Sequence, residues 1–123
     1  MGRIPYFRRK KPFALATLAF GYGVSASTLQ LAQAYATLAN QGQTIKPRLI
    51  RGHKQTTGQQ VLDPQVARQV MSMLESVIQH GGTGVKARVP GYRVAGKTGT
   101  SRKATPGGYD LNAYVALFAG IIP

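Results

Sequence analysis

A run of apolar residues near the end of the chain constrains the fold more than any other feature. Residues 113–122 read Ala-Tyr-Val-Ala-Leu-Phe-Ala-Gly-Ile-Ile, with apolar side chains at both odd and even positions. Because successive side chains of a β-strand point to opposite faces of its sheet, such a strand is apolar on both faces. The run is too short to cross a membrane, which takes about 20 apolar residues. We therefore predict a buried strand in an α+β fold whose sheet carries helices on both faces.

A second strand is predicted directly upstream, and the two strands are expected to pair. Residues 92–95 alternate in polarity, and the strand is predicted to continue to residue 101. The segment over residues 102–110 is polar and contains a Pro-Gly-Gly triplet, which is typical of a turn. Two strands joined by a short connection pair antiparallel. The sequence therefore predicts an antiparallel sheet in which residues 92–101 lie beside residues 113–122.

The first helix is predicted upstream of these strands, followed by a short hairpin. Ser27 and Gln30 have the spacing of a capping box, which favours a helix over about residues 28–40. Residues 44–51 are partly β-prone and contain a proline, which suits an edge strand. Residues 60–62 are expected to be its returning partner.

A second helix is predicted from Asp63 as N-cap and Pro64 as the first helical residue. A glycine pair at residues 81–82 is expected to end it. Its apolar stripe has helical spacing and consists of Val66, Val70, Met73 and Val77. Residues 83–88 are expected to form a further short helix.

The chain is strongly basic, with 16 Lys and Arg against 3 Asp and Glu in 123 residues and a net charge of +13. Residues 1–12 hold five of these cations together with two prolines, which predicts a basic extended arm. One interpretation of this charge is a basic binding module for an acidic polymer such as nucleic acid. No nucleic-acid-binding motif accompanies the charge, however, which favours a solvated basic surface.

The composition also limits the chemistry. The chain has no cysteine, two histidines and three acids that are far apart in sequence. We therefore predict no disulfide, no metal site and no cofactor. The sequence holds no apolar segment typical of a signal peptide or a membrane span, so the chain as written is expected to remain cytoplasmic.

Two motif interpretations compete over residues 91–100. Residues 91–98 read Gly-Tyr-Arg-Val-Ala-Gly-Lys-Thr, which matches the phosphate-loop pattern G-x-x-x-x-G-K-[ST]. That loop should follow a buried strand and open a helix, but residues 86–90 do not form such a strand. Thr98 is also followed by Gly99 and a turn-rich segment. The context therefore argues against nucleotide binding.

The second interpretation rests on Lys97, Thr98, Gly99 and Thr100, the K-T-G element that penicillin-binding proteins and β-lactamases carry on a strand. There a cation neutralises the substrate carboxylate, and flanking hydroxyls hydrogen-bond to it. Gly99 has no side chain, so the acyl chain can approach the strand backbone. The amide of Thr100 can face the developing oxyanion. These four residues are the predicted substrate-binding and β-lactam-binding residues.

The flanking stretches strengthen the resemblance. They are residues 20–23 (Phe-Gly-Tyr-Gly), residues 28–32 with 35–36, residues 82–87 (Gly-Thr-Gly-Val-Lys-Ala), and residues 91–100 with 102–103. In this order they resemble class B penicillin-binding proteins, above all the septal, division-specific peptidoglycan D,D-transpeptidases of the FtsI type. The similarity covers residues 13–123, which are interpreted as the C-terminal portion of a penicillin-binding transpeptidase domain.

This resemblance implies a fold and a reaction. The implied fold is a five-stranded antiparallel sheet between helical layers. In the implied reaction a serine is acylated by the penultimate D-alanine of a D-Ala-D-Ala stem peptide, and a second stem peptide resolves the intermediate. β-Lactams acylate the same serine. The resemblance also implies division proteins as partners, and a parent protein anchored in the inner membrane with a periplasmic catalytic domain.

Two motifs of this family are not found in the chain. Its five serines are Ser25, Ser27, Ser72, Ser76 and Ser101, and none begins S-x-x-K or S-x-N. In the family these motifs lie upstream of the region present here. We therefore predict a substrate-binding strand without a catalytic nucleophile, inactive by itself. A doubly apolar strand with missing neighbours further predicts a homo-oligomer or a strand-swapped dimer.

Overall fold

The structure, a computed structural model of the whole chain, describes residues 16, 21, 24–48, 50 and 58–122. The chain divides into two compact units, residues 1–32 and residues 33–123. The predicted basic arm over residues 1–12 lies outside the described residues.

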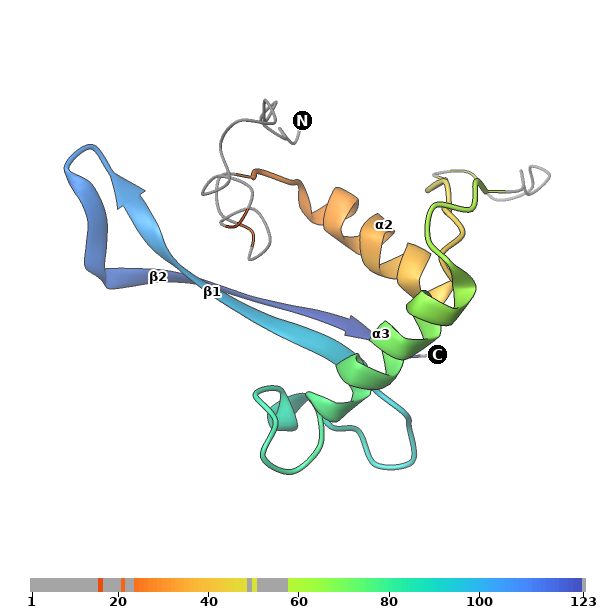
Figure 1. Cartoon of the computed structure of the whole chain (residues 1–123). Coiled ribbons are helices and arrows are strands. Elements are labelled where there is room, and N and C mark those ends of the chain that lie inside the picture. Colours follow the sequence, from red (N-terminus) through yellow and green to blue (C-terminus); the bar gives the residue numbers. More distant parts are fainter. Residues whose placement is uncertain (1–15, 17–20, 22–23, 49, 51–57, 123) are drawn as a thin grey trace. The chain divides into compact units, whose positions relative to one another are not determined.

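Helix α2 spans Thr28–Ala39, which confirms the first predicted helix (Figure 1). The capping box is reciprocal: the Ser27 amide donates to Gln30 Oε1 at 2.9 Å, and the Gln30 amide donates to Ser27 Oγ at 3.3 Å. After the helix, Gly42 takes a φ of +84° and its amide donates to the Thr37 carbonyl at 2.8 Å. This left-handed residue satisfies one of the orphan carbonyls at the helix end.

The short hairpin predicted between the helices is reduced to an isolated bridge in the described residues. Residues 44–48 and 61–62 are not strand, and an antiparallel bridge joins Gln43 to Gln60. Two hydrogen bonds join Thr44 to Gln59. The Thr44 amide donates to the Gln59 carbonyl, and the Thr44 hydroxyl accepts from the Gln59 amide. Pro47 has no amide to donate to a ladder, which limits strand pairing in this segment.

Helix α3 spans Pro64–Ser76. Its start is as predicted, because the Asp63 carboxylate accepts from the Gln65 amide at 2.6 Å and Pro64 occupies the first turn. Its end is not as predicted: the helix stops before the glycine pair, and residues 77–82 continue as turns.

The buried face of this helix is rotated from the predicted one. Val66 and Met73 are 47% and 66% exposed, whereas Ala67 and Leu74, which lie seven residues apart, are buried. Val70 and Val77 of the predicted stripe are half-buried beside this face.

The predicted short helix over residues 83–88 is present as a single 3₁₀ turn, η1, over Val85–Ala87. A turn at Gly91, with a φ of +82°, then leads into the sheet.

The sheet is an antiparallel hairpin of β1, Ala95–Thr105, and β2, Gly108–Ile121. The predicted pairing is therefore confirmed, but the predicted polar turn over residues 102–110 is too long. The strands extend to Thr105 and restart at Gly108, with an irregularity between Arg102 and Ala104. Polar residues remain in these strands because this end of the hairpin is exposed on both sides. The first strand also begins three residues later than predicted.

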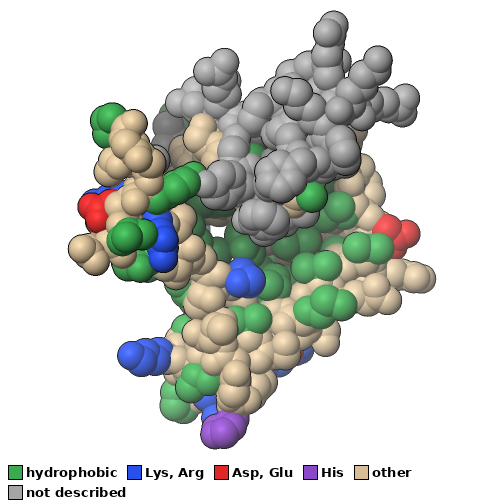
Figure 2. Space-filling model, turned by 60° about the vertical axis from the view of Figure 1, so that its left-hand side comes forward, with side chains coloured by type: hydrophobic (Ala, Val, Ile, Leu, Met, Phe, Trp, Pro, Cys, Tyr) green, Lys and Arg blue, Asp and Glu red, His purple; other side chains and the backbone are tan. Residues whose placement is uncertain are grey.

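The core of the described residues is small: its buried apolar side chains are Ala67, Leu74, Ile78, Val94 and Ala95. Helix α3 packs against β1 and forms this core. The prediction that residues 113–122 are buried on both faces is wrong for this chain, since Leu117 and Phe118 are 48% and 44% exposed. Apolar side chains are accordingly visible at the surface in Figure 2. The physical reason is that the described part of the sheet has two strands, so β2 has no second neighbour.

Within the described ranges, no helix combines the length and apolarity that a bilayer crossing requires.

Candidate functional site

The candidate site lies in the first half of β1. Side chains alternate along a strand, so Thr98 and Thr100 lie on one face and Lys97 and Gly99 on the other. Lys97 and Thr100 are exposed, and Thr98 and Gly99 are half-buried. The structure thus brings the four predicted residues onto one segment and divides their side chains between its two faces.

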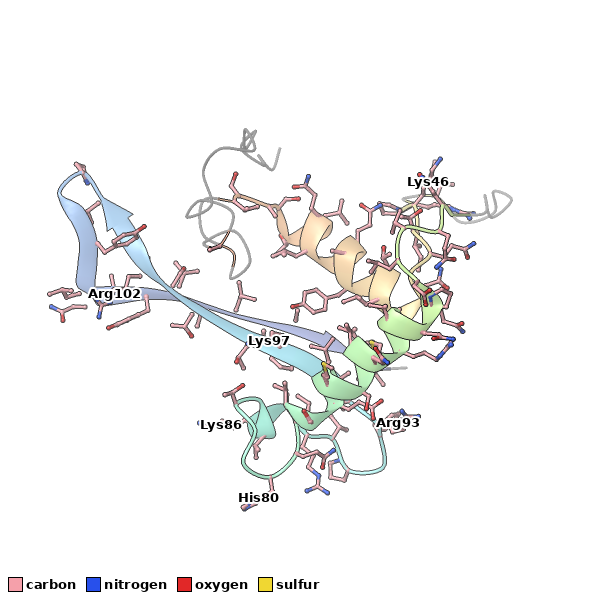
Figure 3. All side chains as sticks on the ribbon, viewed as in Figure 1. Lys46, His80, Lys86, Arg93, Lys97 and Arg102 are labelled. Atoms are coloured by element: carbon pink, nitrogen blue, oxygen red, sulfur yellow. The ribbon has the colours of Figure 1, made fainter. Side chains whose placement is uncertain are left out.

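The Lys97 ammonium lies against the backbone of its own strand. Its Nζ donates to the backbone carbonyl of Thr98 at 2.7 Å (Figure 3). The ion pair near the start of β1 joins Arg93 to Glu75 at 2.5 Å. Among the residues that the structure describes, no carboxylate lies within ion-pair distance of Lys97. Its charge faces a neutral carbonyl and remains available to an anion.

A phenylalanine ring beside two glycines fixes the strand register next to Lys97. Gly96 lies opposite Gly120, and Phe118 lies opposite Thr98. A Cβ at Gly96 would stand 2.5 Å from Phe118 Cζ, and one at Gly120 would stand 2.9 Å from Phe118 Cε1. The ring therefore occupies the space that both glycines leave open. A shift of one residue in register would place a side chain in this space.

Gly99 is also closed in by its partner strand. Gly99 lies opposite Leu117, and a Cβ at Gly99 would stand 3.1 Å from Leu117 Cγ. Strand packing is therefore a second reason for glycine here, beside the ligand approach that the motif predicts.

A threonine hydroxyl from outside the motif forms a hydrogen bond with the hydroxyl of Thr98. Thr83 Oγ1 and Thr98 Oγ1 are 2.9 Å apart and share one hydrogen bond across 15 residues of chain. Sequence reasoning used the segment around Thr83 only as part of a resemblance and did not assign it to the site. The signal that was present is a threonine between two glycines, Gly82 and Gly84, in a loop that returns to the motif strand.

The loop that carries Thr83 is held by its backbone. The Gly84 amide donates to the Val77 carbonyl at 2.9 Å, and the Gly82 amide donates to the Gln79 carbonyl at 2.9 Å. A Cβ on Gly82 would run into the Val77 carbonyl, and one on Gly84 would stand 2.9 Å from Ile78 Cδ1. Both glycines let the loop lie directly on the turn after α3, which fixes the position of Thr83.

The geometry excludes the phosphate-loop interpretation. Residues 96–98 are part of β1, in regular register with β2. A phosphate loop would wrap these residues at the N-terminus of a helix, where free amides converge on the anion. Among the described residues, no three His, Asp or Glu side chains come together as a metal site.

Comparisons with known proteins support the K-T-G interpretation of β1. Residues 7–123 match the family described as "Penicillin binding protein transpeptidase domain". The chain is 42% identical to the probable peptidoglycan D,D-transpeptidase PbpC of Pseudomonas aeruginosa and 39% identical to the peptidoglycan D,D-transpeptidase FtsI of Escherichia coli K12. Each alignment covers 99% of this chain, which spans 22% and 21% of the length of these relatives.

A solved structure shows the same fold. The crystal structure of penicillin-binding protein 3 from Mycobacterium tuberculosis, complexed with aztreonam, matches 98% of this chain with a TM-score of 0.87 and 33% identity. The chain covers 31% of that structure. The chain therefore belongs to the family of penicillin-binding protein transpeptidase domains. The α+β fold class and the resemblance to FtsI-type proteins are confirmed.

We predict that Gly96→Ala disturbs the strand pairing beside Lys97. The new methyl group would meet the Phe118 ring and the Ala119 carbonyl, at 2.5 and 2.9 Å. Crowding of this kind costs about 1–3 kcal/mol. Amide hydrogen exchange of the β1 and β2 residues should show an opening free energy that is lower by this amount.

The matched control is Gly107→Ala, where a Cβ meets nothing within 4 Å and the backbone suits any residue. Its exchange should stay within about 0.5 kcal/mol of the unchanged chain. Equal effects of the two substitutions would show that the ring does not fix the register.

Proposed function

We propose that the Lys97–Thr100 strand binds the terminal carboxylate of a D-Ala-D-Ala stem peptide, and the carboxylate of a β-lactam, within a peptidoglycan D,D-transpeptidase domain. The observation that carries this proposal is the exposed Lys97 ammonium, which has no carboxylate partner among the described residues and is followed on the same strand by two threonines, Thr98 and Thr100. Family membership supports it, as does the aztreonam complex of the M. tuberculosis protein.

The residue chemistry fits a carboxylate. An ammonium has three protons and keeps two after its bond to the Thr98 carbonyl. The hydroxyls of Thr98 and Thr100, which share one face of the strand, would donate to the carboxylate oxygens. The Lys97 ammonium, which reaches the strand edge at the Thr98 carbonyl, would add a charge-assisted bond from that edge. Residues two apart direct their backbone groups to the same edge of a strand, so the Thr100 amide lies on the edge to which the Thr98 carbonyl points. This amide is the donor that we assign to the oxyanion of the acyl intermediate.

The nucleophile of this reaction is not assigned to any residue of the chain. None of the five serines begins the S-x-x-K motif that would supply both the nucleophile and its base. We propose that the chain contributes carboxylate binding and that acylation uses a serine outside the given sequence. Crosslinking of stem peptides, association with division proteins and anchoring of a periplasmic domain in the inner membrane are proposed for the parent protein on the same basis.

Lys97→Met tests the site. Loss of a charge-assisted hydrogen bond costs about 1.5–3 kcal/mol, so the dissociation constant for N-acetyl-D-Ala-D-Ala should rise about 10-fold to 100-fold in an NMR titration. Lys103→Met is the matched control, because it removes the same charge from an exposed position of the same strand. It should leave the affinity within about twofold.

The same two variants distinguish the carboxylate site from the alternative function, a basic module that binds an acidic polymer. In that case binding of single-stranded DNA would weaken equally in both variants and fall steeply with salt. Equal effects of Lys97→Met and Lys103→Met on the dipeptide would contradict the carboxylate site.

We further propose that a second copy of the chain covers the exposed side chains of residues 113–122. This stretch has no second strand neighbour among the described residues, and it exposes Tyr114, Val115, Leu117 and Phe118 by 44–52%. An uncovered apolar strand is a template for pairing with another chain. Exchange of strands or helices between two copies is a low-cost route to a dimer.

Sedimentation over a range of concentrations in moderate salt should show a dimer or larger species. Leu117→Lys should shift the population toward monomer, because a charge on the strand opposes its burial. Leu111→Lys makes the same change at a residue that is 64% exposed and lies outside residues 113–122, and it should have little effect. A folded monomer with a cooperative melt at high concentration would contradict this proposal.

A further inference from the structure

We infer that Thr83 is a positioning residue that sets the direction of the Thr98 hydroxyl toward a bound carboxylate. The inference rests on the proposed function and extends it to a residue outside the motif strand. It starts from the 2.9 Å contact between the two hydroxyl oxygens, in which either oxygen can be the donor.

The argument follows from the number of protons. Each hydroxyl has one proton and can also accept. Without a ligand, the pair is free to point either way. A carboxylate can only accept hydrogen bonds, so a carboxylate bound at Thr98 accepts the hydrogen bond that the Thr98 hydroxyl donates. Thr98 Oγ1 then has only lone pairs left for Thr83, and Thr83 must be the donor.

The bound arrangement is therefore a directed chain from the Thr83 hydroxyl to the Thr98 hydroxyl to the carboxylate. Hydrogen bonds in such a chain polarise and strengthen one another. Lys97 does not replace Thr83 in this role, because its side chain leaves the strand on the other face and its ammonium contacts the Thr98 carbonyl and not the Thr98 hydroxyl. The chain of bonds gives the site a preference for a charged carboxylate over a neutral amide of the same shape.

The contact has little weight in the stability of the fold. Thr83 is exposed, and its loop is fixed by the backbone bonds of Gly82 and Gly84, which do not involve its hydroxyl. A hydrogen bond between solvent-accessible hydroxyls replaces bonds that water makes equally well. Loss of the Thr83 hydroxyl should therefore change ligand binding and leave the loop in place.

Thr83→Val keeps the side-chain shape and removes the hydroxyl. The dissociation constant for N-acetyl-D-Ala-D-Ala should rise about threefold to tenfold in an NMR titration, the size expected for one neutral hydrogen bond. Thr83→Ser should restore affinity to within about twofold. The C-terminal amide of the same dipeptide, whose neutral oxygen accepts a weaker hydrogen bond, should lose less affinity in Thr83→Val than the carboxylate does. Thr105→Val, at an exposed threonine of the hairpin turn, is the matched control and should have no effect.

A double-substitution cycle separates positioning from general support. In a Thr98→Val background, Thr83→Val should cause no further loss, because the hydroxyl it acts through is gone. An equal loss in both backgrounds would overturn the inference, as would failure of Thr83→Ser to restore binding. Amide exchange of residues 82–87 checks that the loop remains folded in each variant.

The outcomes also distinguish this inference from the function on which it rests. If Thr98→Val weakens dipeptide binding and Thr83→Val does not, the carboxylate site stands and the role of Thr83 is refuted. If the unchanged chain does not bind the dipeptide at all, both are refuted. The side-chain rotamer of Thr98, measured by three-bond couplings without ligand, should become averaged in Thr83→Val and stay fixed in Thr83→Ser.

Discussion

The antiparallel register between β1 and β2 is the constraint on which the site depends. It is fixed where the Phe118 ring fills the space left by Gly96 and Gly120. Side chains alternate along a strand, so a slip of one residue in register would turn every side chain of β1 to the opposite face. Thr98 and Thr100 would then lie on the face that Lys97 occupies now, and Lys97 on theirs. The ring–glycine contact lies directly beside the motif, so the position of each motif residue is coupled to it.

A second set of contacts connects the helix to the same strand. Helix α3 packs on β1, and backbone hydrogen bonds of Gly82 and Gly84 hold the loop of Thr83 on the turn after the helix. The hydroxyl of Thr83 then reaches Thr98. Strand β2 therefore fixes the register of the motif strand, and the loop after α3 sets the direction of a side chain on it. This division explains how a small core can position a candidate site that is largely exposed.

The sequence predicted the helices and the strand pairing more accurately than it predicted which of their side chains are buried. The helix starts at Ser27 and Asp63 follow from local capping chemistry, which a sequence carries in full. The antiparallel pairing followed from the turn and the apolar run. The buried face of α3 was predicted one residue away from the observed face, because an alanine such as Ala67 adds little to an apolar stripe and its burial depends on neighbours in space. The exposure of residues 113–122 depends on neighbours in space, which periodicity does not report. In the site, Lys97 and Thr98 were found from the motif, but Thr83 acts across 15 residues of chain and only the fold joins it to them.

Cross-strand NOEs in the isotope-labelled chain test the central claim most directly. The account predicts contacts between Thr98 and Phe118 and between Gly96 and Gly120, the register that places the motif threonines on one face and Lys97 on the other. The Phe118 ring protons should also show NOEs to the α-protons of both glycines. A pattern in which Thr98 lies opposite Leu117 or Ala119, or the absence of cross-strand contacts at these residues, would contradict the account.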